Sequence, residues 1–150
     1  MFVKDYENNF SFYVPDEFSE IKQENYDAWG VVKGTLHYFV VLDDEGEVEK
    51  AVSINKLKDT ETPEEWAQLV KASVKEFEDF GFQINEVEKL KLTDKMTVDR
   101  ITYLGDVNDY YVTYMASLKG LNICSTISIG EDYDDEETIL AVIFSSIEEM

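Results

Sequence analysis

The residue types allow one form of nucleophilic catalysis, because the chain holds a single cysteine, Cys124, and a single histidine, His37. A cysteine nucleophile needs a base beside it and an acid that orients the base. Both residues fall on expected strands, so folding could bring them together. However, the sequence around Cys124 offers no positive environment of the kind that reactive thiols need. We therefore expect Cys124 to be a small buried thiol and His37 to be an ordinary residue of a sheet.

Two acidic stretches, 43–47 and 131–137, are candidates for cation binding. An EF-hand loop places acidic ligands at its first, third and fifth positions and an invariant glycine at its sixth. If Gly46 takes the sixth position, Val41 takes the first, so the spacing does not fit. We expect 43–47 to be a hairpin turn and 131–137 to be a solvated helix start, with no metal ligands and no cofactor. Cation binding by these stretches is kept as the alternative.

Other catalytic patterns give no lead. The sequence contains no P-loop, no dinucleotide-binding glycine motif, no metalloprotease or serine-hydrolase motif and no C-x-x-C pair. Paired carboxylates could hydrolyse glycosides, but with 33 acidic residues any chosen pair carries no information. We therefore expect a protein that is not an enzyme, and an unrecognised hydrolase is the least favoured alternative.

The charge balance excludes several classes of partner. The 33 acidic residues face 13 basic ones, which gives a formal net charge of −20. Such a surface repels the phosphate backbone of nucleic acids and anionic membranes. No apolar run approaches the roughly 20 residues of a membrane span, and the polar start shows no secretory signal. We expect a cytosolic protein that binds neither nucleic acid nor membrane; its oligomeric state is left open, a homodimer included.

Tyrosines are the candidate binding residues. Amphipathic aromatic side chains are enriched at protein interfaces, and four tyrosines gather in one part of the second half of the chain. These interface candidates are Tyr103, Tyr110, Tyr111 and Tyr114. We expect them to contact a protein partner with a basic or apolar surface.

The first third of the chain predicts strands. The expected strands are 9–14, 29–32, 35–42 and 48–54. In the first of them Phe10 and Phe12 share one side, as the period of a strand requires, and the chain that follows it is polar and irregular. Gly30 is expected to bend the second strand. The last two form a hairpin, with Gly46 free to take a positive φ in the turn.

A helix is expected to begin at Thr62, followed by Pro63 at the first helical position and Glu65 in capping-box spacing. Apolar residues then recur at three- and four-residue intervals and form one face: Trp66, Leu69, Val70, Val74 and Phe77. Gly81 is placed to end the helix in the left-handed conformation. We expect the large side chains of this face to be buried.

The second half of the chain predicts a meander and a helix. The expected strands are 84–93, 98–104, 110–118 and 121–129. Short turns join them, which indicates antiparallel neighbours. In the last strand the apolar residues and Ser125 face one side, and Cys124 faces the other. The terminal helix is expected to be capped by Asp134 or Asp135. Its buried residues are Leu140, Ile143, Phe144 and Ile147.

This order of elements predicts a single α+β domain over 1–150, an antiparallel sheet with helices packed on its faces in an α/β/α sandwich. The segment 10–18, which reads F-x-F-x-x-P-x-x-F, resembles the start of the PsbP-like superfamily, and Thr62-Pro63-Glu64-Glu65-Trp66-Ala67 resembles the start of its central helix. The resemblance covers nearly the whole chain as a layout of elements. It implies a PsbP-like fold, and it supplies no catalytic residue, because the superfamily has no invariant one.

The superfamily includes the photosystem II extrinsic protein P, the bacterial DcrB-like proteins and a eukaryotic Ran-binding nuclear transport factor. One branch consists of small cytosolic adaptor chaperones for type VI secretion effectors, and the length and acidity of this chain are similar to that branch. The resemblance implies a protein-interaction module, such as a small acidic bacterial adaptor or chaperone. The strong negative charge also allows an immunity-type protein that blocks a basic toxin, since electrostatic steering would favour that pair. The alternative is a domain that binds a small ligand or a divalent cation.

Overall fold

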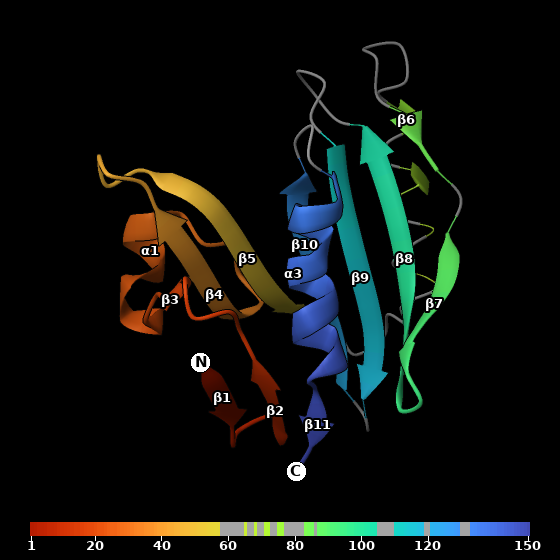
Figure 1. Ribbon diagram of the computed structural model, residues 1–150, viewed down its shortest axis with the longest axis horizontal. Coiled ribbons are helices and arrows are strands. Elements are labelled where there is room, and N and C mark those ends of the chain that lie inside the picture. The colour runs from red at the N-terminus through yellow and green to blue at the C-terminus, as the bar shows by residue number, and fades with distance from the viewer. Residues whose placement is uncertain are drawn as a thin grey trace.

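The structure is a computed structural model of the 150-residue chain. It describes residues 1–57, 65, 68, 71–72, 75–76, 83–85, 87–104, 110–118, 121–129 and 133–150. Within these ranges the chain is built mostly of antiparallel strands, with helix α3 packed on one side of the larger sheet (Figure 1).

The larger sheet has the strand order β3-β4-β5-β10-β9-β8-β6, and β7 also pairs with β8. Its strands are β3 (Ser19–Glu20), β4 (Thr35–Leu42), β5 (Val48–Lys56), β6 (Gln83–Ile84), β7 (Glu88–Thr93), β8 (Met96–Leu104), β9 (Tyr110–Leu118) and β10 (Leu121–Ile129). Every pair is antiparallel. The order means that the β4–β5 hairpin joins the meander of β7 to β10 through the β5–β10 pair.

The predicted hairpin of β4 and β5 is confirmed. The N–H of Asp43 donates to the carbonyl of Glu47 at 2.8 Å, and the N–H of Gly46 donates to the carbonyl of Asp43 at 3.0 Å. Gly46 has a φ of 80°, which a residue without Cβ adopts at little cost. The turn therefore forms for the reason that the sequence indicates.

The predicted meander is confirmed, but its first strand is divided. Instead of one strand over 84–93, β6 and β7 pair separately with β8. Gln83 lies opposite Leu104 and Glu88 opposite Arg100, so six residues on this edge face five on β8. The extra residue interrupts the ladder, as a bulge does. Alternation of side chains along a strand does not reveal such an insertion.

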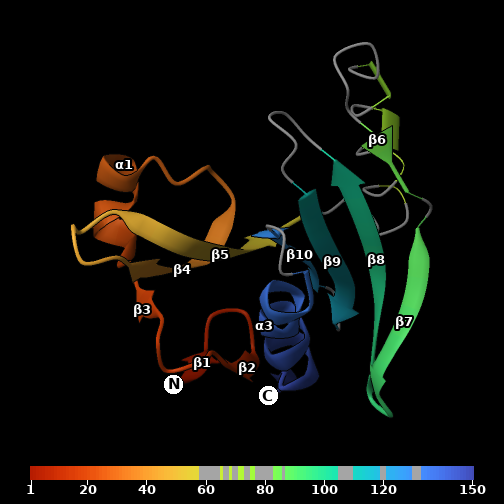
Figure 2. The same cartoon turned by 45° about the horizontal axis from the view of Figure 1, so that its top comes forward.

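A second, smaller sheet lies beside the first and was not predicted as a sheet (Figure 2). Its middle strand is β2 (Phe10–Tyr13), flanked by β1 (Phe2–Asp5) and β11 (Glu148–Glu149). Val3 lies opposite Phe12, and Glu148 lies opposite Ser11. β2 is the expected first strand, whereas the short β1 and β11 depend on pairing with it.

The strand expected over 29–32 is wrong. A 3₁₀ turn (Gln23–Asn25) leads into the short helix α1 (Tyr26–Trp29). Gly30 has a φ of 67°, and its N–H and that of Val31 donate to the carbonyls of Asp27 and Tyr26. Gly30 therefore ends a helical turn in the left-handed conformation and does not bend a strand.

The terminal helix α3 (Tyr133–Ser145) covers one side of the larger sheet and contacts β10, β2 and β7. It begins before the expected caps, so Asp134 and Asp135 lie inside its first turn. The apolar stripe expected on it is confirmed, because all four of its side chains are buried: Leu140, Ile143, Phe144 and Ile147. Phe10 and Phe12 of β2 pack into the same core.

The other side of the larger sheet carries a small cluster of Leu57, Ile101, Met115 and Cys124.

The helix expected to begin at Thr62 is described at six positions, and all six are helical: residues 65, 68, 71, 72, 75 and 76. These residues are exposed or half-buried, and in the sequence they lie between the residues of the expected apolar face. That face, with Trp66 and Phe77, and the ends at Thr62 and Gly81 lie outside the described residues.

Candidate ligand pocket around His37

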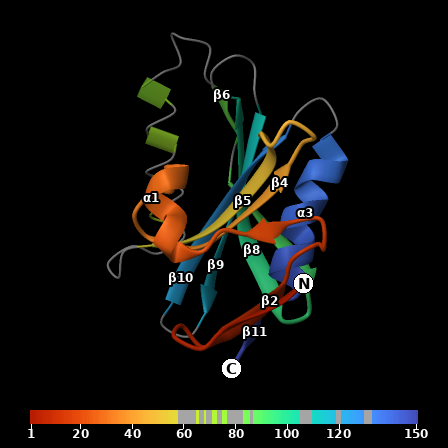
Figure 3. The same cartoon turned by 90° about the vertical axis from the view of Figure 1, so that its left-hand side faces the viewer.

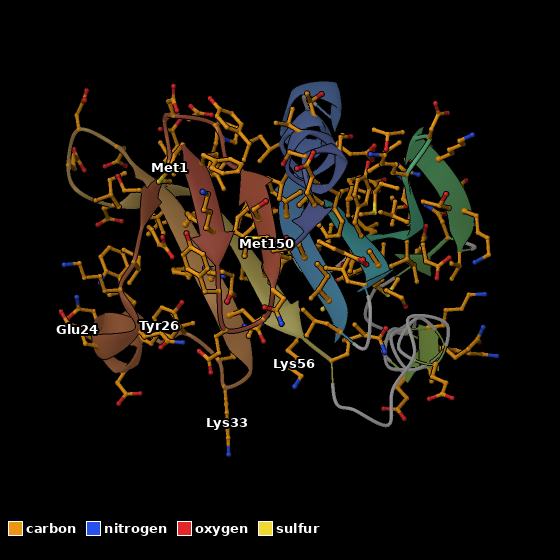
Figure 4. The ribbon with its side chains drawn as sticks, turned by 90° about the horizontal axis from the view of Figure 1, so that it is seen from below. Met1, Glu24, Tyr26, Lys33, Lys56 and Met150 are labelled. Carbon is orange, nitrogen blue, oxygen red and sulfur yellow. The ribbon has the colours of Figure 1, made fainter. Side chains whose placement is uncertain are left out.

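A polar pocket opens where the small sheet meets the β3–β4 edge of the larger one. Its volume is about 690 Å³, within the roughly 300–1,000 Å³ of typical small-molecule sites. The residues that matter to its chemistry are Asp5, Glu20, Lys22, Tyr26, His37 and Lys56. Figure 4 looks at this end of the molecule, with Tyr26 of α1 on one side and Lys56 at the end of β5 on the other.

His37 is held between two carboxylates. Its Nε2 lies 2.8 Å from Oδ2 of Asp5, and its Nδ1 lies 3.2 Å from Oε1 of Glu20. A ring nitrogen donates only when it carries a hydrogen, so both contacts are hydrogen bonds when the ring carries two. The ring thus joins β1, β3 and β4 through one side chain, with one carboxylate at each ring nitrogen.

Asp5 is the anchor of this arrangement. Its Oδ1 accepts the backbone N–H of Asn8 at 2.9 Å, and its Oδ2 accepts the Asn8 side-chain amide at 3.0 Å. Burial opposes ionisation of this carboxyl, but the hydrogen bonds from Asn8 and His37 outweigh it, so the pKa of Asp5 lies below its usual value. Asp5 is therefore an ionised, fully engaged carboxylate in a nearly buried position.

Aromatic rings fix the position of the imidazole. The ring of His37 stacks on Phe39 and meets Phe12 edge-on, with centroids 6.2 Å and 5.2 Å away. At the pocket wall the hydroxyl of Tyr26 donates to the carbonyl of Leu36 at 3.4 Å. Burial, and secondly the negative charge of Glu20, raise the pKa of Tyr26. His37 is thus more than an ordinary sheet residue, contrary to the expectation from its neighbours in sequence.

Cys124 does not meet His37. His37 lies opposite Ile54 on β5, whereas Cys124 lies opposite the next residue, Asn55. Successive residues of a strand point to opposite faces, so the sheet separates the thiol from the imidazole. The cysteine–histidine pair required for thiol attack is not formed, and Cys124 is a buried residue of the small apolar cluster, as expected.

The four candidate interface tyrosines do not share one surface. Tyr114 is 1% exposed and belongs to the core under α3, so its assignment as an interface residue is wrong. Tyr110 packs against the same core. Tyr103 and Tyr111 lie opposite each other on the other face, with their rings stacked at 5.1 Å. An interface role of Tyr103, Tyr110 or Tyr111 stays a prediction.

Tyr114 takes part in an ionic network that the sequence did not reveal. Arg100 Nε donates to Oε1 of Glu137 at 2.9 Å, and the hydroxyl of Tyr114 donates to Oε2 at 3.3 Å. Burial, followed by the charge of Glu137, raises the pKa of Tyr114 to about 12. The network fastens α3 to β8 and β9. Its one available signal was the single arginine of the chain, placed on an expected strand.

The acidic turn of the β4–β5 hairpin uses its first carboxylate internally. Oδ1 of Asp43 accepts the N–H groups of Glu45 and Glu47, both at 2.9 Å. This is how an aspartate closes a turn on its own backbone. The second acidic stretch, 131–137, lies partly outside the described residues, and in the rest of the described chain no three His, Cys, Asp or Glu side chains are grouped as metal ligands.

Comparison with known proteins defines the class through the fold. No protein-family model matches the chain, and no curated protein sequence matches it. Its fold, however, is PsbP-like, in agreement with the resemblance seen in segments 10–18 and 62–67. At the sequence identities given below, this likeness describes the fold alone.

Two solved structures illustrate the match. Cyanobacterial PsbP (CyanoP) from Synechocystis sp. PCC 6803 has a TM-score of 0.65 and 16% identity, and the alignment covers 100% of this chain and 92% of that one. A protein from Bacteroides thetaiotaomicron VPI-5482 has a TM-score of 0.56 and 10% identity over 99% of this chain. The chain spans about half of that protein, since 48% of it is covered.

Proposed function

We propose that this protein is a non-enzymatic protein-interaction module that binds a basic partner through the tip of its β4–β5 hairpin. The observation that carries the proposal is a pair of exposed apolar side chains whose neighbours in the sequence are acidic. Leu42 and Val48 lie opposite each other at the end of the hairpin and are 45% and 46% exposed. The acidic residues around them are Asp43, Asp44, Glu45, Glu47 and Glu49.

The position and chemistry of the tip suit this role. The turn lies at the free end of the hairpin, away from α3 and the meander (Figure 1). Burial of exposed apolar side chains favours association, and charge complementarity guides the partner and excludes wrong ones. A net charge of −20 favours a partner with the opposite sign. A small acidic adaptor, chaperone or immunity-type protein would present such a surface to its partner. We propose a cytosolic location together with this role.

The proposal is tested by affinity capture with matched variants. The hairpin variant carries Leu42→Ser and Val48→Ser, and the control carries Val142→Ser, which removes an exposed apolar side chain of α3. We expect the native chain and the control to retain the same basic protein, and the hairpin variant to lose it. Retention of one partner by all three chains would refute the hairpin as the binding surface, and capture of no partner would refute the module itself.

A second function, binding of a small polar ligand, is favoured by the pocket around His37. Its volume of about 690 Å³ and its buried Asp5–His37 pair give it the two features of a ligand site, space and fixed polar groups. A melting-temperature screen against small metabolites tests this candidate, because a ligand that binds only the folded state raises the melting temperature with concentration. A Glu20→Gln variant should reduce that rise without affecting capture of the protein partner.

The finer architecture is also part of the proposal. We propose that the chain is a two-sided α/β/α sandwich, in which the helical residues 65, 68, 71, 72, 75 and 76 belong to the layer on the face opposite α3. In Figure 3 the helical pieces at these positions and α1 lie on one side of the larger sheet, and α3 lies on the other. The small apolar cluster around Met115 gives that layer a surface to cover.

A further inference from the structure

We propose that the pocket around His37 binds a small oxyanion, of the phosphate or polycarboxylate type. This inference rests on the second candidate function, a ligand site at this pocket, and names the chemistry that the site selects. Nothing about the overall composition suggests it, because the chain has 33 acidic residues and 13 basic ones. The argument comes from the local arrangement of charges.

Two of the three carboxylates in the pocket lining, Asp5 and Glu20, already face donors of the protein. Asp5 accepts two hydrogen bonds from Asn8 and faces Nε2 of His37. Glu20 faces Nδ1 of the same ring at 3.2 Å. Their charges are therefore directed at the imidazole and the turn, and a cation entering the pocket would have to displace these donors.

The cationic side chains come from three different elements. Lys4 of β1, Lys22 after β3 and Lys56 at the end of β5 line the same pocket. They match in number the carboxylates of the lining, Asp5, Glu7 and Glu20. A pocket with this balance is unusual in a chain with a net charge of −20, and it lets an anion approach where the average surface repels it.

Neutral donors add to the selectivity for oxygen. The side-chain amide of Gln23 lines the pocket beside Lys22, whereas the hydroxyl of Tyr26 already donates its hydrogen to the carbonyl of Leu36. Ammonium groups act as point charges toward phosphate, and amide N–H groups complete the hydrogen bonds of the remaining oxygens. A compact ligand with three or more oxygens uses such donors better than a single carboxylate does, which points to phosphate groups and polycarboxylates.

The single histidine makes the experiment direct. The imidazole C–H signals of His37 are the only ones of their kind in a proton NMR spectrum of the chain, and they report on the pocket. Inorganic phosphate, citrate and calcium chloride are titrated separately at constant ionic strength and pH, in a buffer without oxyanions. The full chain is compared with Lys22→Gln, Lys56→Gln and the control Lys33→Gln, which removes an equal charge from an exposed residue that does not line the pocket.

We expect phosphate or citrate to move the His37 signals along a saturable curve, and the preferred of the two identifies the source of the oxyanion. Loss of one charge-assisted hydrogen bond should weaken binding about tenfold in Lys22→Gln or Lys56→Gln, with no change in Lys33→Gln. Equal weakening in all three variants would refute the site. A saturable response to calcium alone would overturn the oxyanion inference and leave a ligand site, whereas no saturable response to any probe would overturn both.

Discussion

Asp5 couples the fold to pH through its hydrogen bonds. Because the hydrogen bonds from Asn8 and His37 outweigh the effect of burial, the pKa of Asp5 in the folded chain lies below the unfolded value of 3.8. A carboxyl with a lowered folded-state pKa stabilises the fold above its unfolded pKa, and this contribution disappears as the pH falls through the folded value. The pH window in which Asp5 matters is therefore the acid limb of the stability curve.

An Asp5→Asn variant should be less stable than the native chain near neutral pH, and the difference should shrink below about pH 4. Urea unfolding at a series of pH values between about 7 and about 3 measures it. Asp44→Asn, a change in the exposed hairpin turn, serves as the control, with a difference near zero throughout. A difference for Asp5→Asn that stays constant down to the acid limit would contradict the role assigned to its carboxylate.

The buried hydroxyl of Ser125 lowers the stability of the fold, and substitution should remove this unfavourable contribution. Its side chain is 0% exposed, and its hydroxyl has no hydrogen-bond partner within the part of the chain that the structure describes. An unsatisfied buried hydroxyl costs about 1–3 kcal/mol, so Ser125→Ala should leave the free energy of unfolding unchanged or raise it. Urea unfolding tests this against Thr113→Val, which breaks the 2.7 Å hydroxyl pair with Thr126 and should lower stability. Destabilisation by Ser125→Ala would show that the hydroxyl has a partner in solution.

Single residues differ in how far the sequence could place them. The burial of Phe10 and Phe12 follows from the alternation of side chains along a strand, because residues two positions apart point to the same face. The interface assignment of Tyr114 failed because closeness in sequence does not fix a face, whereas the pairing of Tyr114 with Arg100 does. The role of His37 was out of reach, since its partners lie 32 and 17 residues away and their approach depends on the packing of two sheets.

At the scale of elements, α3 is held to the sheet by charge as well as by its apolar stripe. Arg100 donates to Glu137 from two nitrogens and to Glu88 from the third. Burial opposes the charge of this guanidinium, but the hydrogen bonds and charge of Glu137 outweigh it and raise the pKa of Arg100. Glu137 lies in the first half of α3, ahead of the buried residues Ile139 and Leu140.

Arg100→Met should therefore lower the free energy of unfolding by about 1–3 kcal/mol, because the part-buried Glu137 loses its charged donor. Lys91→Met is the control, since it removes an exposed cation that pairs with Asp94 at 3.5 Å, and exposed pairs contribute about 0–1 kcal/mol. Chemical denaturation of both variants measures the difference. Equal effects of the two changes would show that the network does not stabilise the attachment of α3.

Elements were predictable where their signals are local. The β4–β5 hairpin follows from the strand pattern and from Gly46 in the turn, and the meander follows from its short connections. By contrast, β1 and β11 are strands only because they pair with β2. β1 has four residues and β11 has two, which is too short for a strand pattern to be recognised in the sequence. The aromatic and branched residues 29–32 favour a strand by composition, but Gly30 closes a helical turn there.

At the scale of the whole molecule, the net charge of −20 opposes the compact state. Salt screens this repulsion, and the Debye length falls from about 30 Å at 0.01 M to about 8 Å at 0.15 M ionic strength. We expect the melting temperature to rise over this range, with sodium chloride giving most of the gain. The acidic hairpin turn supports screening over specific cation binding, because Oδ1 of Asp43 already accepts hydrogen bonds from the backbone N–H groups of Glu45 and Glu47.

Differential scanning calorimetry in sodium chloride and in calcium chloride of matched ionic strength separates screening from specific binding. Under screening, the two salts give similar melting temperatures. A further rise of several degrees in millimolar calcium, lost in an Asp43→Asn and Asp44→Asn double variant, would establish cation binding by the turn in place of screening.

The small sheet also sets an order of events during synthesis. β2 is made long before β11, yet β11 pairs with it and the hydroxyl of Ser146 accepts the N–H of Tyr13 across 133 positions of the chain. Contacts this distant form slowly, because a long loop must close before they are gained. On the ribosome, Phe10 and Phe12 can pack against His37 of β4, but the part of their packing that α3 and β11 supply is missing until these elements have emerged. This N-terminal segment is where a nascent chain of this protein is most open to chaperones or to aggregation.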